Sequence, residues 1–194
     1  HKYAWLMEFL GNIKHYESNT HETVRLALLA RKRLFNIAEQ ENIDFDLEKR
    51  GILHFYHSEQ DYNFATRVND MLCAGGLERH AVTLDEIRKI EPSLTGNYYG
   101  GFYCPGDATG DIHKFTTGLA NVTQKNGVNY LFGMEVVDVE HTQNKVLIKY
   151  HQSTENMLQN SAIVEHLEAD AVLVCGGVGS YQLANQLGDR VNIY

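Results

Sequence analysis

A glycine-rich segment near the end of the chain offers the clearest chemistry. Asp170 precedes the apolar run 171–175 (AVLVC), and the glycine-rich turn 176–179 (GGVG) then leads into Ser180. A continuous apolar run predicts a strand buried on both faces, and the free N–H groups of a helix start attract anionic groups. The segment is therefore a candidate dinucleotide contact at the carboxyl end of a strand. A strand-to-helix turn without a ligand explains the same residues equally well.

Two further observations give less support to a nucleotide site. No Gly-x-Gly-x-x-Gly follows a strand, so the usual cradle for a pyrophosphate is not in this chain. The segment 133–139 (GMEVVDV) predicts a strand whose simplest interpretation is the core of a sheet.

Histidine and tyrosine side chains on one expected strand form a candidate pocket. In the segment 51–57 (GILHFYH), alternation places His54 and Tyr56 on one face and His57 on the other. His54 and Tyr56 are the candidate substrate-binding residues of this pocket, although aromatic and imidazole side chains on strands are more often half-buried sheet residues. The ten histidines do not form a metal-ligand set, and no Gly-x-Ser-x-Gly motif supports a serine nucleophile. No metal site is expected, and the catalytic residue remains unknown.

The elements that position these residues begin with helices over 1–43, with a cap at Asn19. Strands are expected at 51–57 and 97–104, where Gly100 and Gly101 indicate a bulge or a close backbone approach. Capping signals predict further helices, which start after Ser58, Thr83 and Asp111 and end at Gly75, Pro92 and Gly127.

The second part of the chain has a different order of elements. Strands are expected at 128–132, 136–139 and 145–150, followed by a hairpin excursion over 151–161. The buried strand 171–175 and a helix that Ser180 caps complete the series. Residues 1–107 thus predict an α+β module, and residues 108–194 an α/β nucleotide-binding module.

Composition excludes several classes of protein. Of 194 residues, 43% are hydrophobic and 22% charged, which is typical of a globular protein. The formal net charge of −8 argues against binding to nucleic acid or to anionic lipid. The three cysteines are far apart, so we expect buried thiols in a reducing, cytoplasmic compartment. No stretch approaches the roughly 18 apolar residues of a membrane span.

Four segments together resemble a known family. Residues 51–61 (GILHFYHSEQD), 90–94 (IEPSL), 107–120 (DATGDIHKFTTGLA) and 169–180 are similar to flavin-dependent D-amino-acid dehydrogenases. These enzymes belong to the superfamily of glycine oxidase, sarcosine oxidase and D-amino-acid oxidase. The 107–120 segment is fairly specific to the dehydrogenases, whereas 169–180 identifies only the superfamily.

The resemblance implies a division of the chain. It makes 1–107 part of a substrate domain, with an antiparallel sheet and helices. Residues 108–194 become the middle stretch of an FAD-binding domain that lacks its Gly-x-Gly-x-x-Gly segment. It places Val136 where the backbone bonds the adenine of FAD, and Gly177 and Val178 at a second flavin contact. The chain departs from the family pattern at Gly179, where relatives often carry an aromatic residue.

The resemblance also implies the activity of the intact protein: oxidation of D-amino acids to 2-oxo acids and ammonia by hydride transfer to FAD. A quinone or another membrane acceptor would take the electrons, with the enzyme cytoplasmic or peripheral on the inner membrane. Two alternatives stay open, an oxygen-using oxidase of the glycine or sarcosine type and a non-catalytic binding module or subunit. As an internal fragment, the chain is expected to be inactive, to lose FAD and to self-associate through exposed apolar surface.

Overall fold

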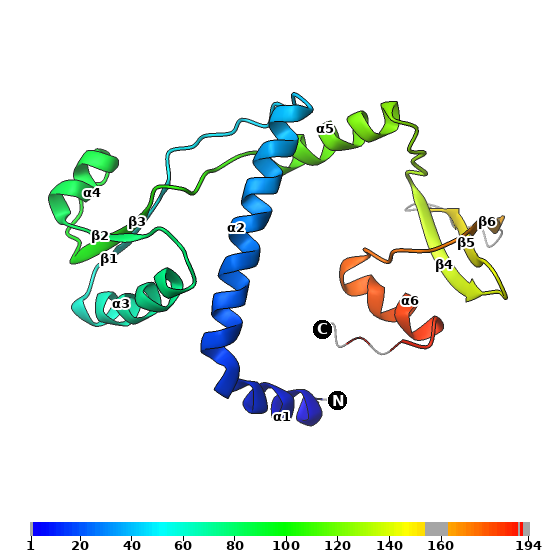
Figure 1. Ribbon diagram of the computed structural model, residues 1–194, viewed down its shortest axis with the longest axis horizontal. Coiled ribbons are helices and arrows are strands. Elements are labelled where there is room, and N and C mark those ends of the chain that lie inside the picture. The colour runs from blue at the N-terminus through cyan, green and yellow to red at the C-terminus, as the bar shows by residue number, and fades with distance from the viewer. Residues whose placement is uncertain (1, 154–162, 190, 192–194) are drawn as a thin grey trace. The chain divides into compact units, whose positions relative to one another are not determined.

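The computed structural model describes residues 2–153, 163–189 and 191. It comprises two compact units, residues 1–128 and 129–194, each of which is described by itself (Figure 1). The boundary between the units follows α5 (Ile112–Lys125), a helix that the sequence assigned to the second part. The assignment of 1–107 and 108–194 to a substrate and a flavin domain remains a prediction, because compact units do not reveal which ligand a domain binds.

Two helices open the first unit. The chain forms α1 (Lys2–Asn12), a single 3-10 turn (Ile13–His15) and the long α2 (Tyr16–Gln40). The predicted cap at Asn19 is wrong, because α2 begins at Tyr16 and continues through that position. No Gly or Pro interrupts α2. The hydroxyl of Thr23 donates to the Asn19 carbonyl, a bond typical of a helix interior.

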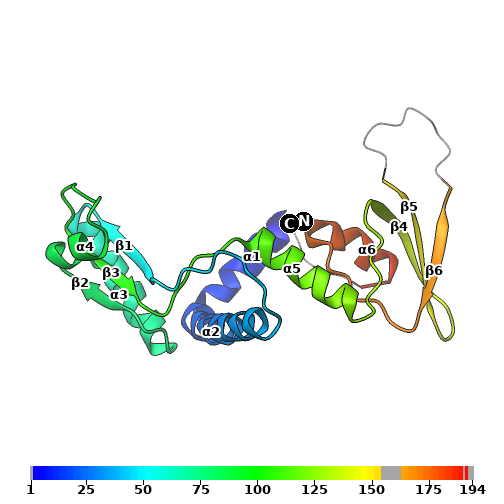
Figure 2. The same ribbon diagram turned by 90° about the horizontal axis from the view of Figure 1, so that it is seen from above.

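A small antiparallel sheet occupies the middle of this unit. Its strands β1 (Ile52–Tyr56), β3 (Gly100–Cys104) and β2 (His80–Val82) lie in that order. The helices α3 (Glu59–Ala74) and α4 (Leu84–Ile90) pack against this sheet, as Figures 1 and 2 show. The strands expected at 51–57 and 97–104 are confirmed. The sequence missed β2, because three residues are too few to show an alternating pattern.

The predicted helix starts after Ser58, Thr83 and Asp111 are confirmed. The Ser58 hydroxyl accepts a hydrogen bond from the Asp61 N–H at 3.1 Å. Thr83 and Glu86 form a reciprocal capping box at the start of α4. The Asp111 carboxylate accepts from the Lys114 N–H at 3.0 Å and opens α5. Each of these contacts closes within one turn, so local sequence is sufficient to predict it.

Buried side chains lie on both faces of the first sheet. Phe102 and Cys104 of β3 face one way, whereas Ile87 of α4 lies on the other face, against Gly101. A separate apolar cluster lies where α2 and α5 meet, and there Phe45 and Phe115 contact edge to face with ring centroids 5.3 Å apart. The sheet is therefore packed on both sides, and the cluster holds the helices beside it.

The second unit is an antiparallel sheet with one helix. The strands β4 (Met134–His141), β5 (Val146–Gln152) and β6 (Glu165–Ala169) follow one another in sequence order. A 3-10 turn (Gly177–Gly179) leads into α6 (Ser180–Gln186), which contacts β4. The strands expected at 136–139 and 145–150 are confirmed. Part of the excursion expected at 151–161 lies outside the described residues.

Three expectations for this unit are wrong. Residues 128–132 and 171–175 are not strands, and Leu173 is 86% exposed. A buried strand needs neighbours that satisfy its N–H and C=O groups, and no described strand pairs with 171–175. Ser180 does not cap α6, because Gly179 occupies the N-cap position and no side-chain bond closes it. With its antiparallel sheets and separate helices, the chain nevertheless has the expected α+β character.

Gly101 lies where β3 closely approaches β1. A Cβ at this position would lie 2.6 Å from the His54 carbonyl oxygen and 3.2 Å from side-chain atoms of Val82 and Ile87. We therefore expect Gly101→Ala to lower the free energy of unfolding by about 1–3 kcal/mol, because backbone has to move. The control is Gly11→Ala in α1, where a Cβ meets nothing within 4 Å. Urea unfolding followed by circular dichroism measures both, and equal stabilities would contradict the close approach.

Candidate functional site

A cavity of about 370 Å³ lies between α3 and the first sheet. His54 and Tyr56 line it from β1, whereas Ala65 and Val68 line it from α3. Arg79, Cys104 and Asp107 also contribute to the wall. The structure thus brings His54 and Tyr56 to one cavity, as the alternation of β1 predicts. Whether they bind substrate stays a prediction.

Aromatic rings form a wall beside this cavity. Tyr62 of α3 stacks on Phe102 of β3, with ring centroids 5.2 Å apart and planes 11° from parallel. Tyr56 meets both rings edge to face, at 6.3 Å from Tyr62 and 6.2 Å from Phe102. The Tyr56 ring is held between these two rings, so packing sets its position in the cavity.

Two arginines and one carboxylate carry the charge of the site. The Arg31 guanidinium of α2 donates to the Asp107 carboxylate at 2.5 Å, and both side chains are partly buried. The Arg79 guanidinium lies 4.8 Å from the centroid of the Phe102 ring, a cation–π contact. The Nε of Arg79 is buried and has no hydrogen-bond partner among the described residues. The charge of Asp107 is therefore paired with that of Arg31, whereas the charge of Arg79 is in contact only with the Phe102 ring among the described residues.

Two other titratable groups of the cavity, His54 and Cys104, have pKa values that favour their uncharged forms. Burial, reinforced by the positive charge of Arg79, lowers the pKa of His54, and Asp107 opposes this only in part. Burial and the neighbouring Asp107 raise the pKa of the Cys104 thiol to about 11. That thiol donates to the Glu78 carbonyl at 3.2 Å. Cys104 therefore does not supply a thiolate nucleophile.

Sequence reasoning missed Arg31 and Arg79 as members of this site. Arg31 stands on the apolar stripe of α2, between Leu28 and Leu34, and a lone charge on such a stripe is a signal for a buried partner. Arg79 gave no signal, because it precedes a strand of only three residues.

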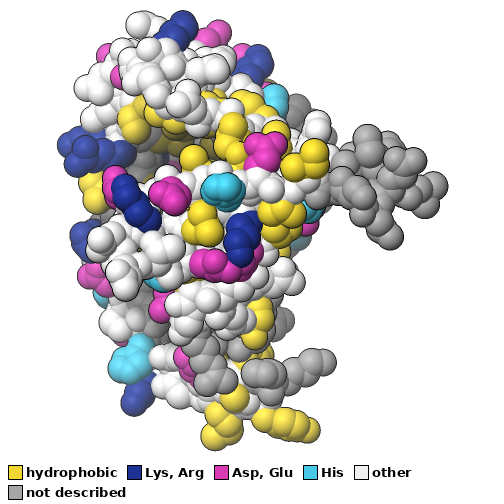
Figure 3. Space-filling view, turned by 90° about the vertical axis from the view of Figure 1, so that its right-hand side faces the viewer, with side chains coloured by type: hydrophobic (Ala, Val, Ile, Leu, Met, Phe, Trp, Pro, Cys, Tyr) yellow, Lys and Arg dark blue, Asp and Glu magenta, His cyan; other side chains and the backbone are white. Residues whose placement is uncertain are grey.

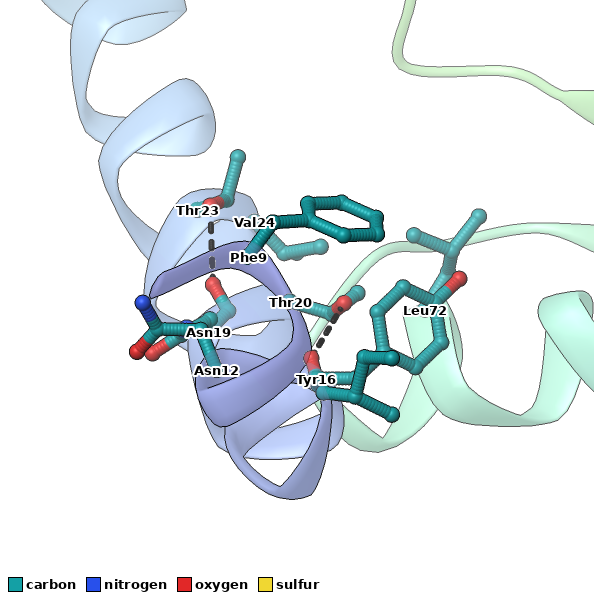
Figure 4. A pocket seen from close by; sticks show the side chains of 9 residues that line it. Phe9, Asn12, Tyr16, Asn19, Thr20, Thr23, Val24 and Leu72 are labelled. Atoms are coloured by element: carbon teal, nitrogen blue, oxygen red, sulfur yellow. Dashed lines mark hydrogen bonds between the residues drawn. The ribbon is translucent and has the colours of Figure 1, made fainter. Parts of the chain in front are cut away.

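A second cavity of about 460 Å³ lies where α1 turns into α2 and approaches Leu72 of α3 (Figure 4). Rings of Phe9 and Tyr16 line it, and no charged residue does. The hydroxyls of Thr20 and Thr23 donate to carbonyl oxygens one turn earlier in α2, as the dashed lines show. Because both threonine hydroxyls are already bonded, the polar groups that this cavity offers a ligand come from Tyr16, Asn12 and Asn19.

The predicted flavin contacts lie in the second unit. Val136 stands in β4 opposite Tyr150, beside an irregularity in the β4–β5 pairing, and is 42% exposed. Gly177 has a positive φ of 57°, and a Cβ there would meet nothing within 4 Å. Val178 is 71% exposed. The Gln186 side chain of α6 donates to the Val137 carbonyl at 3.2 Å, which ties the helix after the glycine turn to β4.

Of these residues, Gly177 has open space around its backbone, and Val136 and Val178 have exposed side chains. The face of the molecule drawn in Figure 3 shows hydrophobic side chains interspersed with acidic and basic ones. Exposed apolar residues of this unit include Met134, Val136, Val137 and Leu167. Whether Val136, Gly177 and Val178 contact a cofactor stays a prediction.

Other candidate chemistry is limited. Among the described residues, no group of three or more His, Cys, Asp or Glu side chains could hold a metal ion. None of the helices in the described part of the chain is long and apolar enough to cross a bilayer. The expectation of three buried thiols is wrong, because Cys73 is half-buried and Cys175 is exposed on the segment that forms no strand.

Sequence comparison identifies relatives along the whole chain. It is 44% identical to D-amino acid dehydrogenase 3 of Mesorhizobium japonicum over 194 residues, which is 100% of this chain and 45% of that relative. It is 35% identical to D-amino acid dehydrogenase of Paramagnetospirillum magneticum over 139 residues, covering 69% of this chain and 33% of the relative. The chain thus spans less than half the length of these curated relatives.

Solved structures share the fold at low identity. Glycine oxidase from Geobacillus kaustophilus matches 84% of this chain and 42% of its own, with a TM-score of 0.71 and 21% identity. L-proline dehydrogenase from P. horikoshii matches 84% and 42%, with a TM-score of 0.66 and 17% identity.

A family model described as FAD dependent oxidoreductase matches residues 4–194. Because this match covers nearly the whole chain and agrees with both sets of relatives, the chain belongs to the FAD-dependent oxidoreductase family.

Proposed function

We propose that the protein containing this chain oxidises D-amino acids to 2-oxo acids and ammonia. The observation that carries the proposal is the 44% identity to a D-amino acid dehydrogenase along the full 194 residues. The cavity of His54, Tyr56 and Arg79 supports it, because it joins apolar walls to a single available positive charge.

The reaction removes a hydride from the α-carbon and a proton from the amine. Water then converts the resulting imino acid into a 2-oxo acid and ammonia. FAD, when bound, supplies the acceptor for the hydride. In this proposal, the residues of the chain position groups and exclude water, and no acid or base is assigned to any of them.

Within the proposal, each predicted site residue has a role. The backbone of Val136 bonds the adenine of FAD, and Gly177 and Val178 contact the cofactor through open backbone and an exposed side chain. His54 and Tyr56 contact the amino acid. His54 does so as a neutral imidazole, because its pKa is lowered by burial and by Arg79.

The proposed electron acceptor is a quinone or another membrane component, which places the protein in the cytoplasm or peripherally on the inner membrane. A second candidate is an oxygen-using oxidase of the glycine or sarcosine type. A third is a non-catalytic module that holds a partner. Exposed apolar side chains of α1, such as Tyr3 and Met7 at 85% and 69%, support self-association of the isolated chain.

The intact protein tests the reaction directly. Anaerobic mixing with D-amino acids is expected to bleach the visible flavin absorbance, whereas the L-enantiomers leave it unchanged. Reoxidation by a soluble quinone should exceed reoxidation by oxygen, and peroxide should not match substrate one to one. Bleaching by L-amino acids alone would contradict the proposal, and stoichiometric peroxide would favour the oxidase.

Cofactor retention by the 194-residue chain is a separate test. We expect the purified chain to fold but not to hold FAD after gel filtration, because adenine contacts do not replace the missing phosphate cradle. Far-UV circular dichroism reports folding, and the ratio of visible to ultraviolet absorbance reports flavin. A stoichiometrically yellow chain would contradict this expectation.

A matched pair of glycines tests the second flavin contact. Gly177 and Gly188 both have positive φ, 57° and 85°, and both have open space around a Cβ. Alanine at either should cost about 1–2 kcal/mol of stability, because the left-handed backbone is strained. Only Gly177→Ala in the intact protein should raise the dissociation constant of FAD, by about tenfold. Equal FAD affinities of the two variants would remove Gly177 from the flavin contact.

A further inference from the structure

The cavity beside β1 holds one positive charge that no carboxylate neutralises. Of its charged groups, Asp107 pairs with Arg31 at 2.5 Å, so their charges cancel and Arg79 remains. No described carboxylate forms an ion pair with Arg79. A charge that is partly removed from water without a partner is costly, which makes this guanidinium a strong attractor for an anion.

The unbonded atom of Arg79 indicates the kind of anion. Its buried Nε has no hydrogen-bond partner among the described residues. Nε–H together with a neighbouring Nη–H is the edge of a guanidinium that bonds both oxygens of a carboxylate. The face of the same group is occupied by the Phe102 ring. The edge is therefore the unbonded part of Arg79, and because its Nε is closed to water in this structure, a ligand bonds it when the side chain turns this edge toward the cavity that Arg79 lines.

The other walls favour an apolar substituent. The cavity is lined by apolar residues of α3 (Phe64, Ala65, Val68 and Leu72) and by Leu77, which follows that helix. Its volume of about 370 Å³ is at the lower end of small-molecule pockets, which occupy about 300–1,000 Å³. A neighbouring cavity of about 350 Å³ shares Leu72, Leu77 and Asp107 with it, so a longer chain has room to extend along α2.

The cavity offers no partner for an ammonium group. Its one carboxylate, Asp107, is already engaged by Arg31. A zwitterionic amino acid would therefore leave its ammonium without an ion pair, beside the positive Arg79. The contacts proposed above for His54 and Tyr56 are accordingly those of the amino acid with a neutral amine, a form that is scarce near neutral pH and so gives a weak apparent affinity.

We propose that this cavity binds a monocarboxylate with an apolar chain and no ammonium group, with its carboxylate on the edge of Arg79 and its chain against α3. Two sources share this chemistry: the 2-oxo acid that the proposed reaction releases, and a simple aliphatic carboxylate. The binding itself does not depend on the proposed reaction, and only the first source rests on it. For a 2-oxo acid product, the site would act as the subsite that holds product after the ammonia has left.

Calorimetric titration of the 194-residue chain tests the proposal with three ligands of equal carbon count: hexanoate, 2-oxohexanoate and D-norleucine. Both acids should bind at least about tenfold more tightly than D-norleucine, because only the latter buries an unpaired ammonium. From butanoate to hexanoate, affinity should rise about fourfold for each methylene. D-Norleucine binding as tightly as hexanoate, or no binding of either acid, would overturn the proposal.

Variants identify the residue responsible. Arg79→Gln should weaken hexanoate binding at least about tenfold, since a charge-assisted hydrogen bond is lost. The control Arg33→Gln removes a charge from the exposed side of α2 and should leave binding unchanged. Val68→Trp keeps Arg79 but fills the cavity, and should abolish binding even if Arg79→Gln fails to fold. Unchanged binding by Val68→Trp, or equal losses in the two arginine variants, would refute the site.

The same titrations separate the two sources. Tighter binding of 2-oxohexanoate than of hexanoate supports the product of the proposed reaction, and equal affinities support a general carboxylate site. Because no turnover is measured, a failure of D-amino-acid oxidation in the intact protein would leave these results standing.

Discussion

Asp107 joins three segments of the first unit that lie far apart in the sequence. Its carboxylate accepts from Arg31 of α2 at 2.5 Å, and its carbonyl accepts from the Gly51 N–H at 3.0 Å, immediately before β1. Its own N–H donates to the Cys104 carbonyl at the end of β3. Since the Arg31–Asp107 pair is partly buried, removing either partner would leave a charge poorly solvated. This pair therefore ties α2 to the end of the sheet, beside the cavity between the sheet and α3, to whose wall Asp107 belongs.

The same pair determines the electrostatics of that cavity. With Asp107 engaged by Arg31, and with His54 and Cys104 neutral near pH 7, Arg79 is the one charge left for a ligand. Apolar residues of α3 line the same cavity, so an anion that reaches this charge is partly removed from water, where its attraction is stronger. A site of this kind selects by charge and by apolar area, and it needs no metal or nucleophile to do so.

The second unit contributes in a different way. Its candidate flavin contacts are Val136, an exposed residue of β4, the left-handed Gly177 and the exposed Val178, so charged side chains play no part in them. The extended segment 171–176 lies without a strand partner in the described residues, yet the helix that follows it is held to β4 by Gln186. The chain belongs to the FAD-dependent oxidoreductases, and in our proposal this surface contacts FAD through apolar and backbone groups.

The sequence by itself determined the features that depend on neighbours within one turn or one strand. The caps at Ser58, Thr83 and Asp111 and the shared face of His54 and Tyr56 follow from such local geometry. Only the tertiary structure decided that 171–175 is not a strand, that Arg31 pairs with Asp107, and that Arg79 remains without a carboxylate. An apolar run becomes a strand only where other strands satisfy its backbone, and a charge is paired or unpaired according to side chains brought from distant parts of the chain. Such partners are set by how the elements pack together, which no local pattern specifies.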